Sequence, residues 1–212
     1  MNINLIRPHY VPNTGSPTKL AVLAHAYKPL GGSSNDYPLR VLARRLCAAG
    51  YFVILYDREK TTLTGDSEVA ELEQVLRSTI STHLSEYPLS KVLIGQGYSA
   101  GSLIVSRLVK PDWLHCEVRY LLLSHPLSVS WALNIFRGAR IQSCLHEIAR
   151  NSKVLAIWGT NDQFTGVERY RQWDADMSSA FPDNWKSVEI AGADHFWSSL
   201  DSVYSSFIEW IT

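Results

Sequence analysis

Short, continuously apolar runs alternate along this 212-residue sequence with longer segments whose apolar residues recur at helical spacing. Apolar runs without polar alternation are typical of strands that are covered on both faces, as in a parallel sheet. The alternation favours a doubly wound, mostly parallel α/β sheet of about seven strands, with helices on both faces and right-handed crossovers. The expected strands are residues 19–25, 51–56, 91–95, 118–123, 153–158 and 185–190, after a weaker run at 2–6.

The segments between the expected strands have helical patterns. Pro38 stands where a first helical residue would be, and Gly50 stands where the residue after that helix would be. A second pattern has apolar residues at 3.6-type spacing from Val69 to Leu84, with Asp66 as a suitable N-cap. No linker or repeat divides the chain, so we expect a single domain over residues 1–212. Further helices are expected at residues 102–109, 143–150, 166–180 and 198–211.

Charge and composition argue against several classes of protein. Lys plus Arg and Asp plus Glu each number 20, and the resulting zero net charge disfavours nucleic-acid binding and polybasic membrane attachment. We find no signal-peptide pattern and no apolar run near 18 residues, so we expect a soluble, cytoplasmic protein without a membrane span. Three cysteines without a C-x-x-C pair predict no disulfide framework. The sequence also lacks H-E-x-x-H and phosphate-loop patterns, so we expect no metal or cofactor.

The clearest motif follows the expected strand at residues 91–95. There GYSAG, at residues 97–101, has the form G-x-S-x-G and continues into a helical pattern. Small residues are needed at both ends of this motif, because its serine occupies a tight strand-to-helix turn that raises the hydroxyl above the sheet. In doubly wound sheets the active site lies beyond the carboxyl ends of the strands. We therefore expect Ser99 to be a nucleophile.

A serine hydroxyl is a poor nucleophile without a base, and sites of this type follow the chain order Ser, acid, His. Asp162 and His195 each follow an expected strand, so both are expected on the same rim as Ser99. We predict His195 as the base and Asp162 as the acid that orients it. Asp194 is the local alternative for the acid, although adjacent side chains diverge, and Asp57 is a more distant one.

An oxyanion hole needs two backbone N–H groups. One is expected from Ala100, directly after the nucleophile, and the other from Ala26 or Tyr27, in the loop after the strand at 19–25. Residues 126–150 leave room for a small flap, so no separate cap domain is expected. The candidate substrate-binding residues are aromatics near strand ends or in adjacent loops: Tyr27, Tyr98, Trp131, Phe136, Phe164 and Phe196.

Together, these motifs resemble the α/β-hydrolase superfamily. GYSAG, GTND and GADHFW carry the likeness, and AHAYKPLGGS and YLLLSHP extend it to a group of small, mostly uncharacterised, largely fungal-type members. These lie near the dienelactone-hydrolase-like and acyl-peptidase-like branches, and the likeness covers about residues 19–211. The resemblance implies Ser99 as nucleophile, Asp162 as acid and His195 as base.

The expected reaction is hydrolysis of a small-molecule carboxylic ester or thioester through an acyl-enzyme. Two alternatives stay open on the same scaffold. One is a non-hydrolytic lyase, isomerase or cyclase, and the other is a catalytically silent binding protein.

Overall fold

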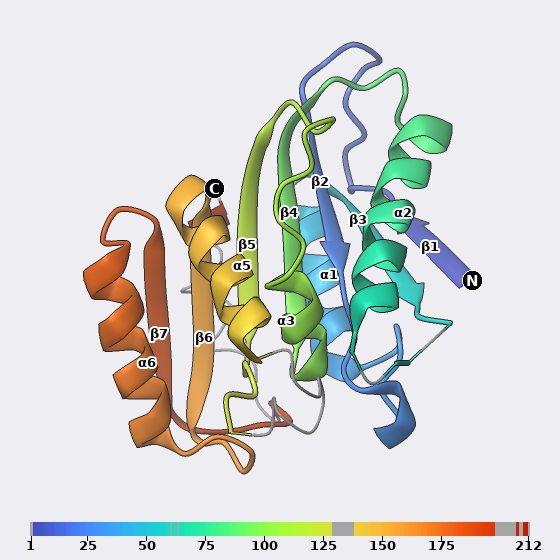
Figure 1. Cartoon of the computed structure of the whole chain (residues 1–212). Helices are drawn as coiled ribbons and strands as arrows, with labels where there is room; N and C mark the ends of the chain where they lie inside the picture. Colours follow the sequence, from blue (N-terminus) through green and yellow to red (C-terminus); the bar gives the residue numbers. More distant parts are fainter. Residues whose placement is uncertain are drawn as a thin grey trace.

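The computed structural model describes residues 2–59, 61, 62, 64–128, 138–197, 207, 210 and 211. Within them, seven strands form one sheet in the order β1-β3-β2-β4-β5-β6-β7 (Figure 1). Only the β1–β3 pair is antiparallel in this described sheet, and the other five pairs are parallel. The predicted mostly parallel sheet is therefore confirmed. Its strands are β1 (Asn2–Ile6), β2 (Thr18–Leu23), β3 (Tyr51–Asp57), β4 (Leu89–Tyr98), β5 (Glu117–Leu123), β6 (Lys153–Asn161) and β7 (Trp185–Asp194).

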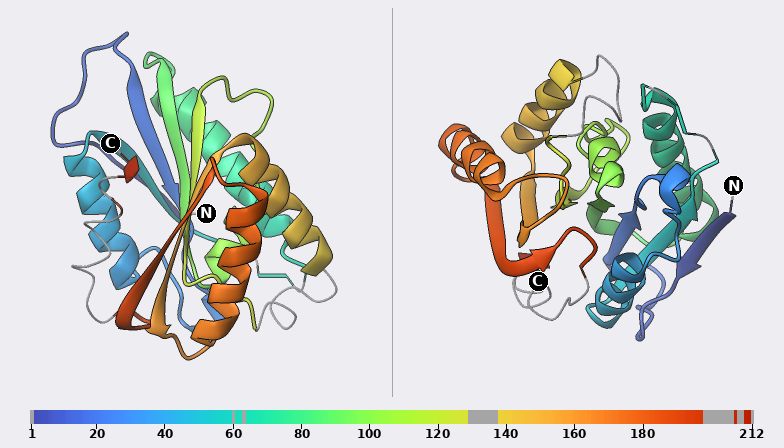
Figure 2. Two further views of the ribbon diagram at one scale, coloured as in Figure 1. Left: turned by 90° about the vertical axis from the view of Figure 1, so that its left-hand side faces the viewer. Right: turned by 90° about the horizontal axis from the view of Figure 1, so that it is seen from below.

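Helices cover both faces of the sheet, as the left-hand view of Figure 2 shows. Helix α1 packs on one face, and α2, α3, α5 and α6 pack on the other. Most of the expected helix at residues 198–211 lies outside the described residues, but Phe207 and Ile211 pack in the same core cluster as α1. The helices are α1 (Tyr37–Ala48), α2 (Asp66–His83), α3 (Ala100–Val105), α5 (Gly138–Asn151) and α6 (Val167–Ala180), with a short 3-10 helix η1 (Lys28–Leu30).

Strand β2 explains why the predicted strands are continuously apolar. Leu20 and Val22 belong to the core beneath α2, whereas Ala21 and Leu23 belong to the core beneath α1. All four side chains are fully buried. A strand covered on both faces has no position left for a polar alternation.

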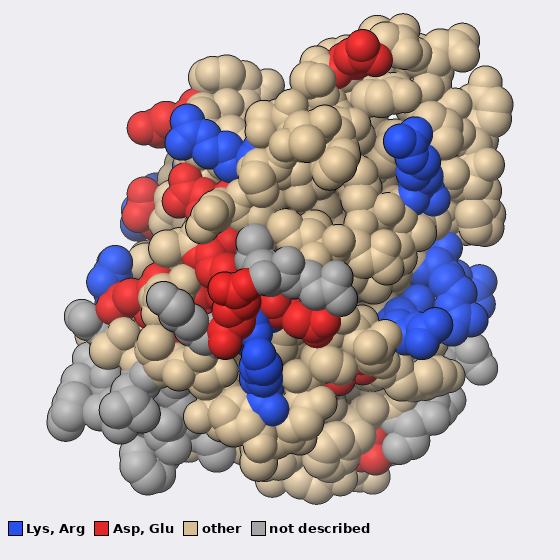
Figure 3. Space-filling view, turned by 90° about the vertical axis from the view of Figure 1, so that its right-hand side faces the viewer, with Lys and Arg blue, Asp and Glu red and all other residues tan. Residues whose placement is uncertain are grey.

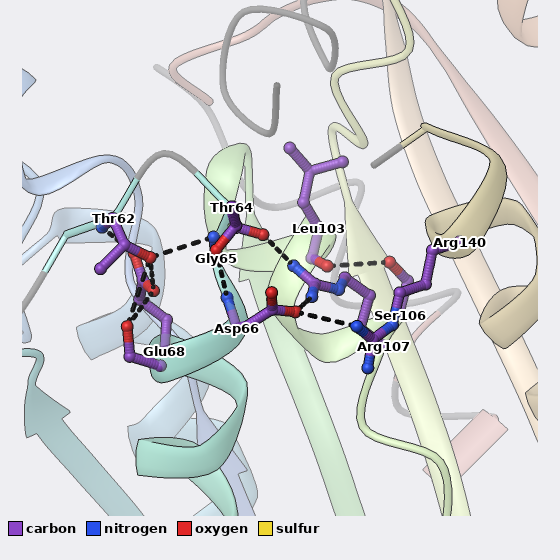
Figure 4. A network of polar contacts seen from close by, with 10 residues as sticks. Thr62, Thr64, Gly65, Asp66, Glu68, Leu103, Ser106, Arg107 and Arg140 are labelled. Atoms are coloured by element: carbon purple, nitrogen blue, oxygen red, sulfur yellow. Dashed lines mark hydrogen bonds and ion pairs between the residues drawn. The ribbon is translucent and has the colours of Figure 1, made fainter. Parts of the chain in front are cut away.

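A polar network beside the sheet joins α2, α3 and α5 (Figure 4). Arg107, just after α3, donates to the carbonyl of Thr64 at 2.6 Å and forms an ion pair with Asp66. Arg140 of α5 contacts the same carboxylate at 3.3 Å. Asp66 opens α2 as its first residue, where a negative charge is favoured by the helix dipole. The predicted N-cap position belongs instead to Gly65, which has a left-handed backbone with φ 68°.

The carboxyl ends of the parallel strands meet at one edge of the sheet, at the bottom of Figure 1. Ser99, Asp162 and His195 each follow directly after a strand at this edge. The described residues form no separate cap; the expected flap falls partly on residues 129–137, outside the described part. No described helix has the length and apolar character needed to cross a membrane.

Candidate active site

Ser99 occupies a strained turn between β4 and α3. Its backbone angles are φ 55° and ψ −121°, a conformation that costs a non-glycine residue about 1–3 kcal/mol. Gly101 makes the turn possible. A Cβ at that position would lie 2.6 Å from the carbonyl oxygen of His25 and 2.7 Å from that of Ala24. This is the geometry predicted from the GYSAG motif, and it leaves the Ser99 side chain at the edge of the sheet.

Hydrogen bonds to its backbone hold Ser99 in this conformation. Its N–H donates to the carbonyl of Leu123 at 3.1 Å. Its carbonyl oxygen accepts the hydroxyl of Ser102 at 2.6 Å. Because that hydroxyl has one proton to donate, it accepts from Nδ1 of His125 at 2.8 Å. The His125 ring is stacked on Trp173, with ring centroids 5.2 Å apart.

Burial lowers the pKa of His125 to about 3, so its ring is neutral at physiological pH. Neither Ser102 nor His125 is among the residues that the sequence motifs predict for the site. The available signals were the spacing of Ser102, one helical turn after the nucleophile, and the place of His125 just past β5.

Asp162 and His195 form a buried pair. Nδ1 of His195 lies 2.8 Å from Oδ2 of Asp162, and these side chains are 3% and 0% exposed. The other carboxylate oxygen accepts the N–H groups of Phe164 and Thr165 at 2.9 and 3.0 Å. The hydroxyl of Tyr170 donates to Oδ2 at 3.3 Å.

These contacts keep the carboxylate charged. Burial raises the pKa of Asp162, but the hydrogen bonds and charge of His195 and the two backbone N–H groups outweigh it, so the pKa lies below its ordinary value. A charged Asp162 holds the His195 proton on Nδ1. That tautomer leaves Nε2 free to accept a proton.

The two alternative acids, Asp57 and Asp194, are not hydrogen-bonded to the ring of His195 in the described structure. Asp57 accepts the N–H of Ser34 at 2.7 Å, at the end of β3. Asp194 is the last residue of β7 and pairs with Asn161 of β6 in the sheet register. The ring of His195 is hydrogen-bonded to Asp162 rather than to its neighbour in sequence. Of the three carboxylates, the geometry favours Asp162.

The two candidates for the second oxyanion donor differ in their hydrogen bonds. The N–H of Ala26 donates to Oδ2 of Asp36 at 3.3 Å. The N–H of Tyr27 has no acceptor among the described residues. Ala100 is the first residue of α3, so its N–H has no acceptor within the helix. The arrangement therefore favours Tyr27 over Ala26 as the partner of Ala100.

A buried arginine fixes the loop that contains Tyr27. The Arg58 guanidinium donates to the carbonyl oxygens of His25, at 2.9 Å, and of Ala26. The backbone N–H of Arg58 donates to Nε2 of His25 at 3.1 Å. Burial and the charge of Arg58 lower the pKa of His25 to about 4, so the ring accepts this bond as a neutral imidazole. The loop is thus fixed by Arg58, the residue that follows β3.

A cavity of about 260 Å³ lies in front of Ser99 and His195. Five of its thirteen lining residues are Tyr or Phe, and the Phe164 ring centroid is 4.4 Å from that of His195. Ser99 and His195 both line this cavity but are not hydrogen-bonded to each other, and catalytic contacts are often long before substrate binds. Two predicted pocket residues, Trp131 and Phe136, lie outside the described residues. The other four, Tyr27, Tyr98, Phe164 and Phe196, line the cavity.

Among the described residues, no group of three His, Cys, Asp or Glu side chains is arranged to hold a metal ion.

Comparisons with known proteins agree with this fold, although no family model matches the chain. An uncharacterised protein of Schizosaccharomyces pombe is 30% identical over 179 residues, which is 78% of this chain and 73% of that protein. An alpha-beta serine hydrolase homologue from Coxiella burnetii matches with a TM-score of 0.70 and 16% identity, covering 99% of this chain and 91% of that one. A Xanthomonas campestris α/β serine hydrolase without a lid also matches, with a TM-score of 0.70 and 16% identity, over 98% and 86% of the two chains.

Proposed function

We propose that this chain, which has the fold of solved α/β serine hydrolases, is a member of the α/β-hydrolase superfamily and a serine hydrolase acting on a small-molecule carboxylic ester or thioester. The observation that carries the proposal is the 2.8 Å bond between His195 and Asp162, at a cavity that Ser99 also lines. Ser99 is the nucleophile, His195 the general base and Asp162 the residue that orients it. The backbone N–H groups of Ala100 and Tyr27 form the oxyanion hole.

The first half-reaction forms an acyl-enzyme. Ser99 Oγ bonds to the acyl carbon while its proton passes to Nε2 of His195. The negative charge on the carbonyl oxygen is stabilised by the N–H groups of Ala100 and Tyr27. The bond to the leaving alcohol or thiol then breaks, and the leaving group takes the proton from His195.

The second half-reaction uses water. His195 takes one proton of a water molecule, whose oxygen bonds to the acyl carbon. The bond to Ser99 Oγ breaks, the proton on His195 returns to Oγ, and a carboxylic acid is released. The charged Asp162 stabilises the imidazolium that forms in both halves.

The cavity suggests which acyl groups are accepted. Tyr98, Phe164 and Phe196 offer apolar surface beside His195. At about 260 Å³ the cavity is slightly below the usual size of a small-molecule site. We expect short and medium acyl chains to be turned over better than long ones.

A panel of p-nitrophenyl esters of graded acyl length tests the proposal. Ser99→Ala and His195→Ala should each lower kcat by about 10³-fold or more, since these residues act as a unit. Ser106→Ala is the matched control and should retain activity, because Ser106 is a nearby buried serine whose hydroxyl donates to the carbonyl of Leu103.

Covalent labelling separates the proposal from its alternatives. A fluorophosphonate should form an adduct on Ser99, located by mass spectrometry. Labelling of Ser99 without turnover of any ester or thioester would favour a non-hydrolytic lyase, isomerase or cyclase. No labelling and no turnover would favour a silent binding protein.

A further inference from the structure

A second cavity, of about 340 Å³, lies between β1, β3 and α1. Its lining includes Arg7, Arg40, Arg44 and His9, and no acidic residue is among the residues that line it. The chain as a whole has equal numbers of acidic and basic residues, so this gathering of cations is local. Figure 3 shows that basic and acidic side chains are also separated on one side of the molecule. There, basic side chains gather at the right-hand border and acidic ones gather in the middle.

The described acidic side chains do not pair with the three arginines. Within the part of the chain that the structure describes, Arg7, Arg40 and Arg44 form no ion pair. The carboxylates of the neighbouring segments do not line the cavity, and they accept backbone N–H groups. Asp36 accepts the N–H groups of Ala26 and Ser33, and Asp57 accepts that of Ser34. The residues that line the cavity therefore have a net positive charge.

Helix α1 gains no stability from this charge distribution. Arg40 and Arg44 are four residues apart on one helix face, and like charges at that spacing repel. Arg40 also lies near the amino end of the helix, where the helix dipole disfavours a cation. The helix itself contains no acidic residue, and Asp36 precedes it as the N-cap. A bound anion would relieve both effects.

We propose that this cavity binds a phosphate group. A guanidinium presents two parallel N–H donors that match phosphate oxygens, and this bidentate contact is stronger than a contact with a neutral group. Three arginines in a lining without an acidic residue favour a ligand with more than one negative charge. A phosphate monoester or diphosphate meets this condition better than a single carboxylate.

The position of the cavity leaves two sources for the phosphate. Ser34 and Asn35 line the arginine cavity, while Asp36, Tyr37 and Pro38 line the cavity of Ser99. The two cavities thus adjoin one short segment of chain. The phosphate is either part of the substrate, on the group that leaves from the acyl carbon, or part of a separate compound. Phosphate binding itself does not depend on the proposed hydrolase activity.

Calorimetric titration with inorganic pyrophosphate tests the binding. Arg44→Gln should weaken binding by about tenfold or more, since a charge-assisted contact is lost. Arg45→Gln is the matched control, because it makes the same charge change at the next position, which does not line the cavity. Binding to the parent protein should also weaken as salt is raised. No binding by the parent, or an equal loss in both variants, would overturn the proposal.

A kinetic comparison identifies the source of the phosphate. Acetyl-coenzyme A is a thioester with phosphates on its leaving group, and p-nitrophenyl acetate carries the same acyl group without them. If the phosphate belongs to the substrate, Arg44→Gln should raise KM about tenfold for the thioester alone. If the protein binds pyrophosphate but Arg44→Gln changes KM equally for both substrates, the cavity binds a separate phosphate compound. The titration needs no turnover, so failure of the proposed hydrolysis would be seen separately.

Discussion

The hydroxyl of Ser102 lies 2.6 Å from the carbonyl oxygen of Ser99 and binds it directly. Since the same hydroxyl accepts from His125, a buried histidine is connected to the backbone of the nucleophile through one side chain. This backbone has a positive φ, so it needs such support. Ser102 and His125 are positioning residues: they act on the turn of Ser99 rather than on the substrate.

Removal of the Ser102 hydroxyl should therefore affect catalysis as well as stability. We expect Ser102→Ala to lower kcat by about tenfold, because a hydrogen bond worth about 1 kcal/mol no longer fixes the turn. The unfolding free energy should fall by about 1–3 kcal/mol, because Nδ1–H of His125 loses its acceptor. The measurements are ester hydrolysis and denaturant unfolding.

Ser102→Thr keeps a hydroxyl and should restore part of kcat. A purely structural role would lower stability and leave kcat per folded enzyme unchanged in Ser102→Ala, which is the result that would contradict positioning.

The choice of acid gives a second prediction. Asp162→Asn should lower kcat by about 10³- to 10⁴-fold, because an amide no longer holds the His195 proton on Nδ1. Asp194→Asn is the matched control, since it makes the same change next to His195 and should have a much smaller effect. A larger loss in Asp194→Asn would mean that the acid is misassigned. Both variants are compared by kcat on one p-nitrophenyl ester.

Two buried histidines make stability depend on pH. The pKa of His125 is lowered to about 3 and that of His25 to about 4, from 6.5 in both cases, with burial as the main cause. The unfolded chain therefore binds more protons than the folded chain between pH 6.5 and these values. Their contribution to stability is complete above pH 6.5 and is lost as pH falls, with a slope of up to about 1.4 kcal/mol per pH unit for each histidine.

Denaturant unfolding between pH 7.5 and 4.5 measures this slope. His125→Asn should reduce it, because the residue that must be neutral in the folded state is gone. His83→Asn removes an exposed histidine and should leave the slope unchanged. Equal slopes in the parent protein and His125→Asn would contradict the assignment.

Gly101 allows a test of the turn with little change in chemistry. A Cβ at Gly101 would lie within 2.7 Å of two carbonyl oxygens, so Gly101→Ala must displace the loop before η1 or the turn of Ser99. We expect a loss of at least about 2 kcal/mol of stability and a large loss of kcat. At Gly166 a Cβ would meet nothing within 4 Å, and its φ of −62° suits alanine. Gly166→Ala should therefore leave both stability and kcat unchanged. Thermal unfolding and esterase assays measure the two quantities.

Local sequence pattern predicted the strands, the GYSAG turn and the places of Asp162 and His195. These features depend on residues close together in the chain, so periodicity and motif spacing reveal them. Strands β6 and β7 run past their predicted ends because polar residues such as Asn161 and Asp194 still pair in the sheet. No pattern marks a polar residue that is needed only because the fold brings it to the site.

Arg58 and Asp36 show this limit clearly. Arg58 binds carbonyl groups 32 and 33 residues earlier in the chain, and Asp36 binds an N–H ten residues earlier. Nothing in the sequence around either residue signals those contacts. The choice between Ala26 and Tyr27 as oxyanion donor stayed open for the same reason, since it depends on which N–H the Asp36 carboxylate binds.

The assignment of the Tyr27 N–H as an oxyanion donor leads to a prediction about the backbone of this residue. Tyr27 has φ −68°, which proline adopts readily, so Tyr27→Pro removes the N–H with little change in conformation. We expect kcat to fall by about 10²- to 10³-fold, as for the loss of one oxyanion donor. Tyr27→Ala is the matched control: it also loses the phenol ring but keeps the N–H, so its kcat should stay within about tenfold of the parent.

Comparison of these two variants separates the backbone from the side chain. Both lose the same contacts with substrate, so a change in KM common to both reports on the ring of Tyr27. The difference in kcat between them reports on the N–H alone. Equal kcat values in Tyr27→Pro and Tyr27→Ala would exclude this N–H from the oxyanion hole. The N–H of Ala26 would then have to leave Asp36 to take its place, and Asp36→Asn, which weakens that bond, should in that case raise kcat.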